Sequence, residues 1–227
     1  MGVFFIYRDK KGGRMNIVIR KVEQKDRKRI LELSREIFWN LYFPGTDIPV
    51  VIDKLHKSKD FIKDLTYVLE IDGEIEGGIY YSLSKIINEK QNKEYGTISF
   101  GPVFISKKYQ RQGYGRKLIT YTIEKAKEKN YRAIITLGYP YHYTPYGFLG
   151  GKNYNISMAD MKFYKGLLVL PLFEDALKDI SGYAVFSKDL EATPKEIDEF
   201  DKNFSYKEKR FQESQLEYER ICSEIDE

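Results

Sequence analysis

The chain has 227 residues, of which 42% belong to the hydrophobic set, and its single cysteine is Cys222. This composition is typical of a globular domain, and it excludes a disordered chain or a disulfide-stapled secreted one. A single cysteine also excludes a Cys-rich metal site, and we expect no bound metal. The net charge of +4, without a motif of interleaved basic and aromatic residues, argues against a nucleic-acid partner.

The positive charge is unevenly distributed along the chain. Residues 191–227 contain 12 acidic and 6 basic side chains, a net charge of −6, so residues 1–190 carry +10. A basic body suits a polyanionic small ligand or an acidic partner, although an ordinary solvated lysine-rich surface explains the charge equally well.

We expect no targeting signal in the N-terminal residues. The apolar stretch at 1–6 is too short for a signal peptide and follows no positive segment. No run of about 18 apolar residues occurs, so we expect no transmembrane helix, no membrane partner and a cytoplasmic protein. Residues 10–15 read Lys-Lys-Gly-Gly-Arg-Met, which purine-rich codons resembling a ribosome-binding site can encode. Met15 is therefore a second candidate for the initiator, with residues 1–14 as an N-terminal extension.

Hydrophobic periodicity predicts alternating strands and helices. Strands are predicted at 16–20, 65–71, 74–87, 96–105, 132–137, 167–172 and 183–186, and helices at 24–41, 47–58 and 113–129. Asp72-Gly73 is a two-residue hairpin turn, and Pro102 marks a bulge or an edge because it cannot donate to a β ladder. The strand, glycine loop, helix and strand from 96 to 137 form a crossover unit. Its two strands should lie side by side and parallel for part of their length.

The sequence changes character after Asp189. Residues 193–196, Thr-Pro-Lys-Glu, form a capping box with proline at the first helical position, so a helix begins there. A second charged helix follows, with one stripe formed by Phe211, Gln215, Tyr218, Cys222 and Ile225. We expect this tail to lie on the domain or on a second subunit, where it would form a homodimer. A charged regulatory or partner-binding arm is the alternative.

Residues 103–116 carry the motif with the clearest chemical meaning. A predicted strand runs into a loop whose Gly113 and Gly115 open a helix, so N–H groups without intrahelical acceptors point into one concavity and suit a phosphate. Arg111 and Arg116 add positive charge beside the helix dipole. Leu118 stands where a Rossmann fingerprint needs a third small residue, and the Gly-Lys-Ser/Thr of a Walker loop is absent.

This segment resembles a known family. Gln110-x-x-Gly113-x-Gly115, after a strand and before an amphipathic helix, is similar to the acetyl-CoA signature Q/R-x-x-G-x-G/A of the GNAT acetyltransferase superfamily. Residues 138–148 resemble the segment G-D-P-x-Y-Y-x-R-F-G-F of one branch of that family. The similarity covers residues 16–186, with a weaker likeness in the tail.

The resemblance implies an α/β GNAT fold. Its sheet is mixed and mostly antiparallel, splayed at the fourth predicted strand near Gly101 to Val103, flanked by helices and followed by a helical C-terminal extension. The chain then divides into an N-terminal extension (1–14), an N-acetyltransferase domain (15–187) and a charged helical tail (188–227).

The resemblance also implies transfer of an acetyl group from acetyl-CoA to a primary amine in a ternary complex without a metal. In the family the main chain of Val103, Phe104 and Ile105 would follow the pantetheine arm. The pyrophosphate would lie on the next loop and helix start, formed by Arg111, Gln112, Gly113, Tyr114, Gly115 and Arg116. Tyr143 aligns with a tyrosine that protonates the CoA sulfur in many relatives, and a phenol suits that role because reference pKa values are about 10 for phenols and about 8.5 for thiols. Packing in an aromatic core is the other explanation for Tyr143.

The remaining roles stay open. Glu70, Glu76 and Asp47 are carboxylates near strand or loop ends, and a structural role is favoured for each, so no general base is identified. His142 is expected on the surface because a helical neighbour of Tyr143 points elsewhere. Five aromatic residues either line the acceptor side, as the corresponding helix and hairpin do in this family, or belong to the core: Trp39, Tyr42, Phe43, Tyr80 and Tyr81.

Three positions depart from the branch pattern. Tyr139 stands where the branch has Asp, Pro145 where it has Arg, and Gly78 where it often has His. The acceptor is therefore left open among a polyamine, an antibiotic, an amino acid, and a protein N-terminus or lysine. The alternative function is a non-catalytic acyl-CoA-binding or sensing module.

Overall fold

The computed structural model describes residues 2–8 and 14–226. Within them the strands are β1 (Val3–Arg8), β2 (Arg14–Lys21), β3 (Tyr67–Ile71), β4 (Glu74–Asn88), β5 (Lys93–Ile105), β6 (Ala133–Leu137), β7 (Leu149–Gly150), β8 (Ile156–Ser157), β9 (Leu167–Pro171) and β10 (Gly182–Val185). The α-helices are α1 (Arg27–Phe38), α2 (Ile48–Leu55), α3 (Tyr114–Glu128), α4 (Pro140–Tyr143), α5 (Pro194–Asp201) and α6 (Glu213–Ser223). Residues 10–13, on which the alternative start rests, lie outside the described residues. None of the described helices has the length and apolar character needed to cross a membrane.

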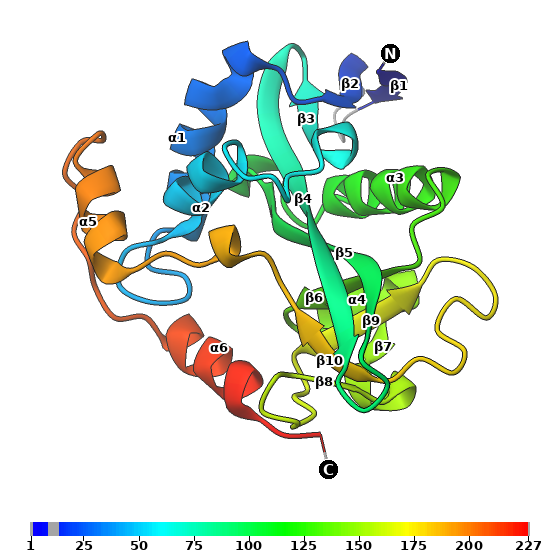
Figure 1. Cartoon of the computed structure of the whole chain (residues 1–227). Helices are drawn as coiled ribbons and strands as arrows, with labels where there is room; N and C mark the ends of the chain where they lie inside the picture. The colour runs from blue at the N-terminus through cyan, green and yellow to red at the C-terminus, as the bar shows by residue number, and fades with distance from the viewer. Residues whose placement is uncertain (1, 9–13, 227) are drawn as a thin grey trace.

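The described strands form one mixed sheet (Figure 1). Its order is β1-β2-β3-β4-β5-β6-β9-β7, and β10 pairs with β4 and β8. Along the main path every pair is antiparallel except β5 with β6, which is parallel at Ile98 and Ile134. The predicted mixed, mostly antiparallel sheet and its parallel crossover pair are therefore confirmed, whereas the sequence pattern did not reveal β1, β7 and β8.

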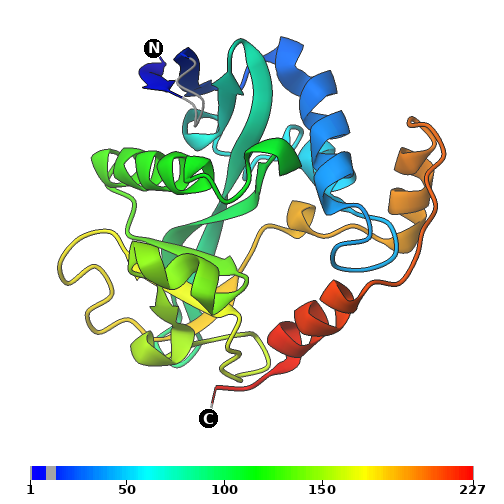
Figure 2. The same ribbon diagram turned by 180° about the vertical axis from the view of Figure 1, so that it is seen from behind.

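Helices cover both faces of the sheet. Helices α1 and α2 lie on one side of β4, and α3 lies on the other (Figures 1 and 2). The alternation of side chains along β4 follows these two layers, since Ile79 and Tyr81 pack with α3 whereas Tyr80 packs with α1 and α2. All three side chains are 0% exposed, so this part of the sheet is buried on both faces.

The sheet opens between β5 and β6, as the resemblance implied. In the ladder with β4, Ile79 pairs with Val103 and Tyr81 pairs with Phe100, so β5 has one residue more than β4 between these pairs. This β-bulge at Gly101 and Pro102 confirms the role predicted for Pro102. Past Ile98 the two parallel strands diverge, and the next contact between them is Thr136 Oγ1 donating to the Phe100 carbonyl at 3.0 Å.

The C-terminal tail lies on the domain. Arg35 of α1, 8% exposed, donates to both carboxylate oxygens of Asp201 at 2.6 and 3.1 Å. Trp39 Nε1 and Asn40 Nδ2 both donate to the Glu208 carbonyl, at 2.8 and 3.1 Å. These contacts attach residues 201–208 to the end of α1.

The two predicted tail helices are present, and the stripe of the second differs in part. The capping box at Thr193 and Glu196 starts α5 as predicted. In α6 the buried residues are Gln215 and Ile221, whereas Cys222 is exposed. Phe211 and Ile225 lie outside α6 and are exposed because the helix starts at Glu213 and ends at Ser223.

Candidate active site

The edge of β5 that faces away from β4 is the first part of the site. Ser106 donates its N–H to the Glu76 carbonyl of β4 at 2.7 Å, so its main chain faces β4. Because main-chain groups of successive strand residues point to opposite edges, those of Ile105 face away from β4. The Ile105 carbonyl accepts a hydrogen bond from Gln110 Nε2 at 2.9 Å, which agrees with this alternation.

The same alternation separates the three strand residues predicted to follow the pantetheine arm. Val103 turns its main-chain groups to the free edge together with Ile105, whereas those of Phe104 face β4. In the described part of the sheet, β6 pairs with β5 only at Ile98, so no strand covers this edge at Val103. The main-chain groups of Val103 and Ile105 therefore face an edge that no strand covers in the described part of the sheet, and the Ile105 carbonyl already accepts from Gln110 there.

Residues 110–116, which we call the glycine loop, lead from the end of β5 into the first turn of α3. Gly113 is the N-cap of α3 with a φ of 85°, a left-handed conformation that favours glycine. Lys117 N–H donates to the Gly113 carbonyl at 3.1 Å, the first bond of the helix, so the amides of Gly115 and Arg116 precede the helical hydrogen-bond ladder. A Cβ on Gly115 would lie 3.6 Å from Ile105 Cγ1, an ordinary contact, so packing within the chain does not require glycine there.

The side chains of the glycine loop have different surroundings. Tyr114 is 6% exposed and its ring packs edge-on against Tyr109, so its side chain belongs to the core. Gln112 Nε2 donates to the Lys108 carbonyl at 2.8 Å and stabilises the loop itself. Arg111 and Arg116 are exposed beside the start of α3, which is where an anion on the loop amides would be.

A cavity of about 310 Å³ opens where β5 and β6 separate, and we call it the splay cavity. Strand residues 99–103 and 136–138 form one wall. Further walls come from the end of α1 and the α1–α2 loop, from α4, from residues 186–191 and from α6. Segments that are far apart in the sequence, from the end of α1 to α6, therefore meet around the splay cavity.

Tyr143 lines the splay cavity. A Cβ on Gly138 would lie 2.6 Å from Tyr143 Cε2, so the ring lies directly against the glycine backbone. Its other ring contacts are with Phe100 and Phe148, at centroid distances of 5.4 and 5.7 Å. A phenol is protonated at neutral pH at its ordinary pKa, and burial raises the pKa of the Tyr143 hydroxyl further.

Of the three carboxylates considered from the sequence, only Asp47 lines the splay cavity. Its burial raises the pKa of the carboxyl group above the ordinary value of aspartate. Glu70 accepts from Arg20 Nη2 at 2.5 Å, and Glu76 lies 3.8 Å from Arg29 Nη2. The expected structural roles therefore fit Glu70 and Glu76, while Asp47 belongs to the cavity. Among the residues the structure describes, no group of three or more His, Cys, Asp or Glu side chains is placed to hold a metal ion.

The predicted aromatic group divides between cavity and core. Tyr42 and Phe43 line the splay cavity, whereas Trp39, Tyr80 and Tyr81 are buried and do not. The sequence grouped them because helical and alternate-strand spacing cannot tell which side of an element faces the cavity.

Two tyrosines of the cavity wall were missed as acceptor-side residues. Tyr218 of α6 stacks on Tyr42 with centroids 4.3 Å apart, and Tyr139 precedes α4. Nothing in the local sequence places Tyr218 there, because the contact joins residues 176 positions apart (218 − 42). His142 is exposed, as expected, and also borders the cavity.

Gly78 stands where the related branch often has His, and packing explains why glycine is needed here. A Cβ there would lie 2.8 Å from Phe104 Cζ, so the Phe104 ring occupies the space of any larger side chain. Tyr139, a second departure, brings an aromatic ring rather than a carboxylate to the cavity wall. The third, Pro145, is exposed in the turn after α4.

Comparisons with known proteins agree with this geometry. The family model described as Acetyltransferase (GNAT) family matches residues 31–142. The N-acetyltransferase YhbS of Escherichia coli K12 is 24% identical over 111 residues, which are 49% of this chain and 64% of YhbS, less than two thirds of its length. A crystal structure of Escherichia coli YhbS in complex with CoA has a TM-score of 0.67 at 21% identity, covering 76% of this chain and 91% of that one. A GNAT acetyltransferase from Brucella melitensis in complex with acetyl-CoA has a TM-score of 0.62 at 21% identity, covering 77% and 98%. The resemblance found in the sequence is confirmed, since residues 31–142 match the GNAT acetyltransferase family.

Proposed function

We propose that the chain is an N-acetyltransferase that moves the acetyl group of acetyl-CoA to a primary amine by direct transfer in a ternary complex. One observation carries the proposal. The uncovered main-chain edge at Val103 and Ile105 connects the glycine loop to the splay cavity, where Tyr143 lies. Family membership and the two CoA-bound neighbours of the same fold support this assignment.

The donor would bind along this edge. The glycine-loop amides and the helix dipole would hold the pyrophosphate, with Arg111 and Arg116 adding charge. The pantetheine arm carries amide groups that would pair with the main chain of Val103 and Ile105 as an added strand does. This arrangement would direct the thioester toward the splay cavity.

The transfer needs an unprotonated amine and a proton for the leaving thiolate. The amine nitrogen attacks the thioester carbonyl, the new C–N bond forms, and the C–S bond breaks. Tyr143, whose phenol is protonated at neutral pH, would give its proton to the CoA sulfur and regain one from the nitrogen. The net products are the acetamide and CoA thiol, and a substrate that binds as an ammonium ion also releases one proton to solvent.

The test is release of free CoA thiol from acetyl-CoA in the presence of a panel of primary amines, with binding of acetyl-CoA measured in parallel. We expect thiol release that depends on the amine, together with saturable binding of acetyl-CoA. Binding without thiol release from any amine would replace the proposal by the non-catalytic acyl-CoA-binding module. Absence of acetyl-CoA binding would overturn both functions.

A further inference from the structure

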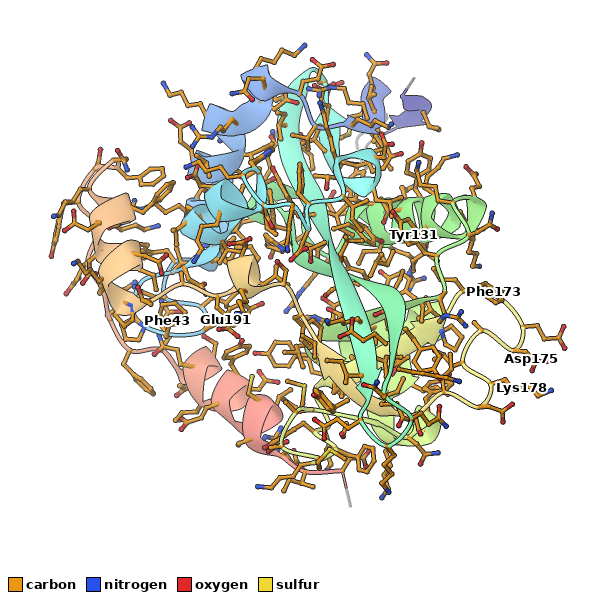
Figure 3. All side chains as sticks on the ribbon, viewed as in Figure 1. Phe43, Tyr131, Phe173, Asp175, Lys178 and Glu191 are labelled. Carbon is orange, nitrogen blue, oxygen red and sulfur yellow. The ribbon has the colours of Figure 1, made fainter. Side chains whose placement is uncertain are left out.

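The walls of the splay cavity are acidic and aromatic. None of its lining residues among those the structure describes is Lys or Arg, although the chain has 38 of them. Asp47 and Glu191 are the carboxylates in the lining, and Glu191 is exposed at the rim. Phe43 and Glu191, both labelled in Figure 3, line this cavity from the α1–α2 loop and from the segment before α5. Two segments far apart in sequence thus meet at this rim.

Among the residues that the structure describes, no lysine or arginine forms an ion pair with Asp47. It is the N-cap residue of α2, but its side chain makes no capping hydrogen bond. Among the described residues, the hydrogen bond recorded for this carboxylate comes from its own main-chain N–H. A partly buried carboxylate without a cationic partner is costly in free energy unless a ligand supplies the charge.

The aromatic part of the wall is fixed by the tail. Tyr42 and Tyr218 stack on each other in the cavity wall, and Ser214 Oγ donates to the Leu41 carbonyl at 2.8 Å. Gln215 Nε2 donates to the Asn40 carbonyl at 3.0 Å, so α6 is tied to the residues beside Tyr42. Tyrosine faces attract organic cations, and the cavity walled by this tied helix suits a small acceptor rather than a folded protein surface.

We propose that the acceptor is a small organic cation, a primary alkylammonium on an apolar or aromatic body, with Asp47 as its counter-ion and the aromatic wall around its body. This inference rests on the proposed acetyltransferase function and names the substrate class of the same cavity. A second carboxylate on the acceptor would oppose Asp47, so amino acids are excluded in favour of their decarboxylated analogues.

Three compounds test separately the positive charge, the reactive N–H and the absence of a carboxylate on the acceptor. The first is 2-phenylethylamine, the second is phenylalanine, which adds one carboxylate to it, and the third is trimethyl(2-phenylethyl)ammonium, which keeps the charge but has no N–H to acetylate. We expect kcat/KM to be at least about tenfold higher for 2-phenylethylamine than for phenylalanine, a difference of about 1.4 kcal/mol. The quaternary cation should bind to the protein loaded with CoA and inhibit in competition with the amine.

Asp47→Asn keeps the shape of the side chain and removes its charge. It should raise the KM for 2-phenylethylamine about tenfold, equal to about 1.4 kcal/mol of binding, and leave the acetyl-CoA Kd unchanged. Glu219→Gln is the matched control, because Glu219 is an exposed carboxylate of α6 outside the cavity lining. It should change neither constant.

The outcomes distinguish this inference from the proposed function. Thiol release that is equal for phenylalanine and 2-phenylethylamine, or unaffected by Asp47→Asn, would overturn the inference while the acetyltransferase stands. Binding of the quaternary cation that Asp47→Asn abolishes, without thiol release from any amine, would support the cation site and overturn the enzyme. Failure of the quaternary cation to bind wild-type protein would overturn the inference by itself.

Discussion

The two ends of the proposed site are built by opposite means. At the donor end, the free edge of β5 and the glycine loop offer main-chain N–H groups beside exposed arginines. In the splay cavity, side chains from distant segments provide aromatic faces and carboxylates, with no Lys or Arg among the described lining residues. The donor end is suited to a polyanion and the splay cavity to a cation.

This difference separates what is general from what is specific. Main-chain groups recognise any pantetheine diphosphate in the same way, so the donor end can be shared by proteins with different acceptors. The chemistry of the splay cavity depends on which side chains meet there. A residue that departs from the branch pattern, such as Tyr139, changes the cavity wall without altering the donor end. Substitutions at each end should therefore affect different constants, and the following predictions test this in order of decreasing effect.

The largest effect is expected where the two ends meet, at Tyr143. Tyr143→Phe keeps the ring against Gly138 but removes the proton donor, so kcat should fall about 100-fold, with little change in the acetyl-CoA Kd. Steady-state kinetics and equilibrium binding of acetyl-CoA measure the two constants. Tyr141→Phe is the control, because Tyr141 is 56% exposed and does not line the splay cavity. An unchanged kcat in Tyr143→Phe would rule out the acid role.

The next effect tests whether the tail belongs to the cavity. Asp201→Ala leaves Arg35, 8% exposed, without its carboxylate partner, and should lower the free energy of unfolding by about 2 kcal/mol. If the loosened tail shifts α6, the KM for the amine rises while the acetyl-CoA Kd stays constant. Denaturant unfolding and kinetics provide the readouts. Asp198 lies in the same helix as Asp201 but forms a more exposed ion pair with Lys209, so Asp198→Ala should have a much smaller effect on stability.

A smaller effect is expected at the donor end. Arg111→Ala should raise the acetyl-CoA Kd about fivefold, roughly 1 kcal/mol, and the loss should shrink at high salt because the arginine is exposed. The KM for the amine should not change. Lys178→Ala, at an exposed cation in the loop after β9 (Figure 3), is the control for a general effect of charge. An equal loss of affinity in both variants would remove the specific role of Arg111.

The sequence predicted the backbone geometry at the donor end better than the side chains that meet in the splay cavity, for the same physical reason. Glycines at Gly113 and Gly115, a strand before them and a helix after them fix main-chain geometry locally, and Pro102 marks the bulge. The contact of Tyr42 with Tyr218 depends on how the tail folds back, which no local pattern encodes. Asp47 carries no distinguishing sequence signal because a carboxylate before a helix usually indicates a cap, and only the fold shows that it does not cap α2.

The smallest effect concerns the stability cost of keeping Asp47 in the cavity. Burial raises its pKa in the folded state above the unfolded value, so its favourable contribution is fully present below the unfolded pKa. That contribution is lost as the pH rises through the folded pKa, and at neutral pH the buried charge destabilises the protein. Asp47→Asn should therefore raise the Tm at pH 7 by about 3 °C, with the gain shrinking as the pH falls toward about 3.9. Thermal unfolding at several pH values measures this gain. A lower Tm for the variant at pH 7 would show that Asp47 stabilises the fold, and its place in the cavity would then be structural.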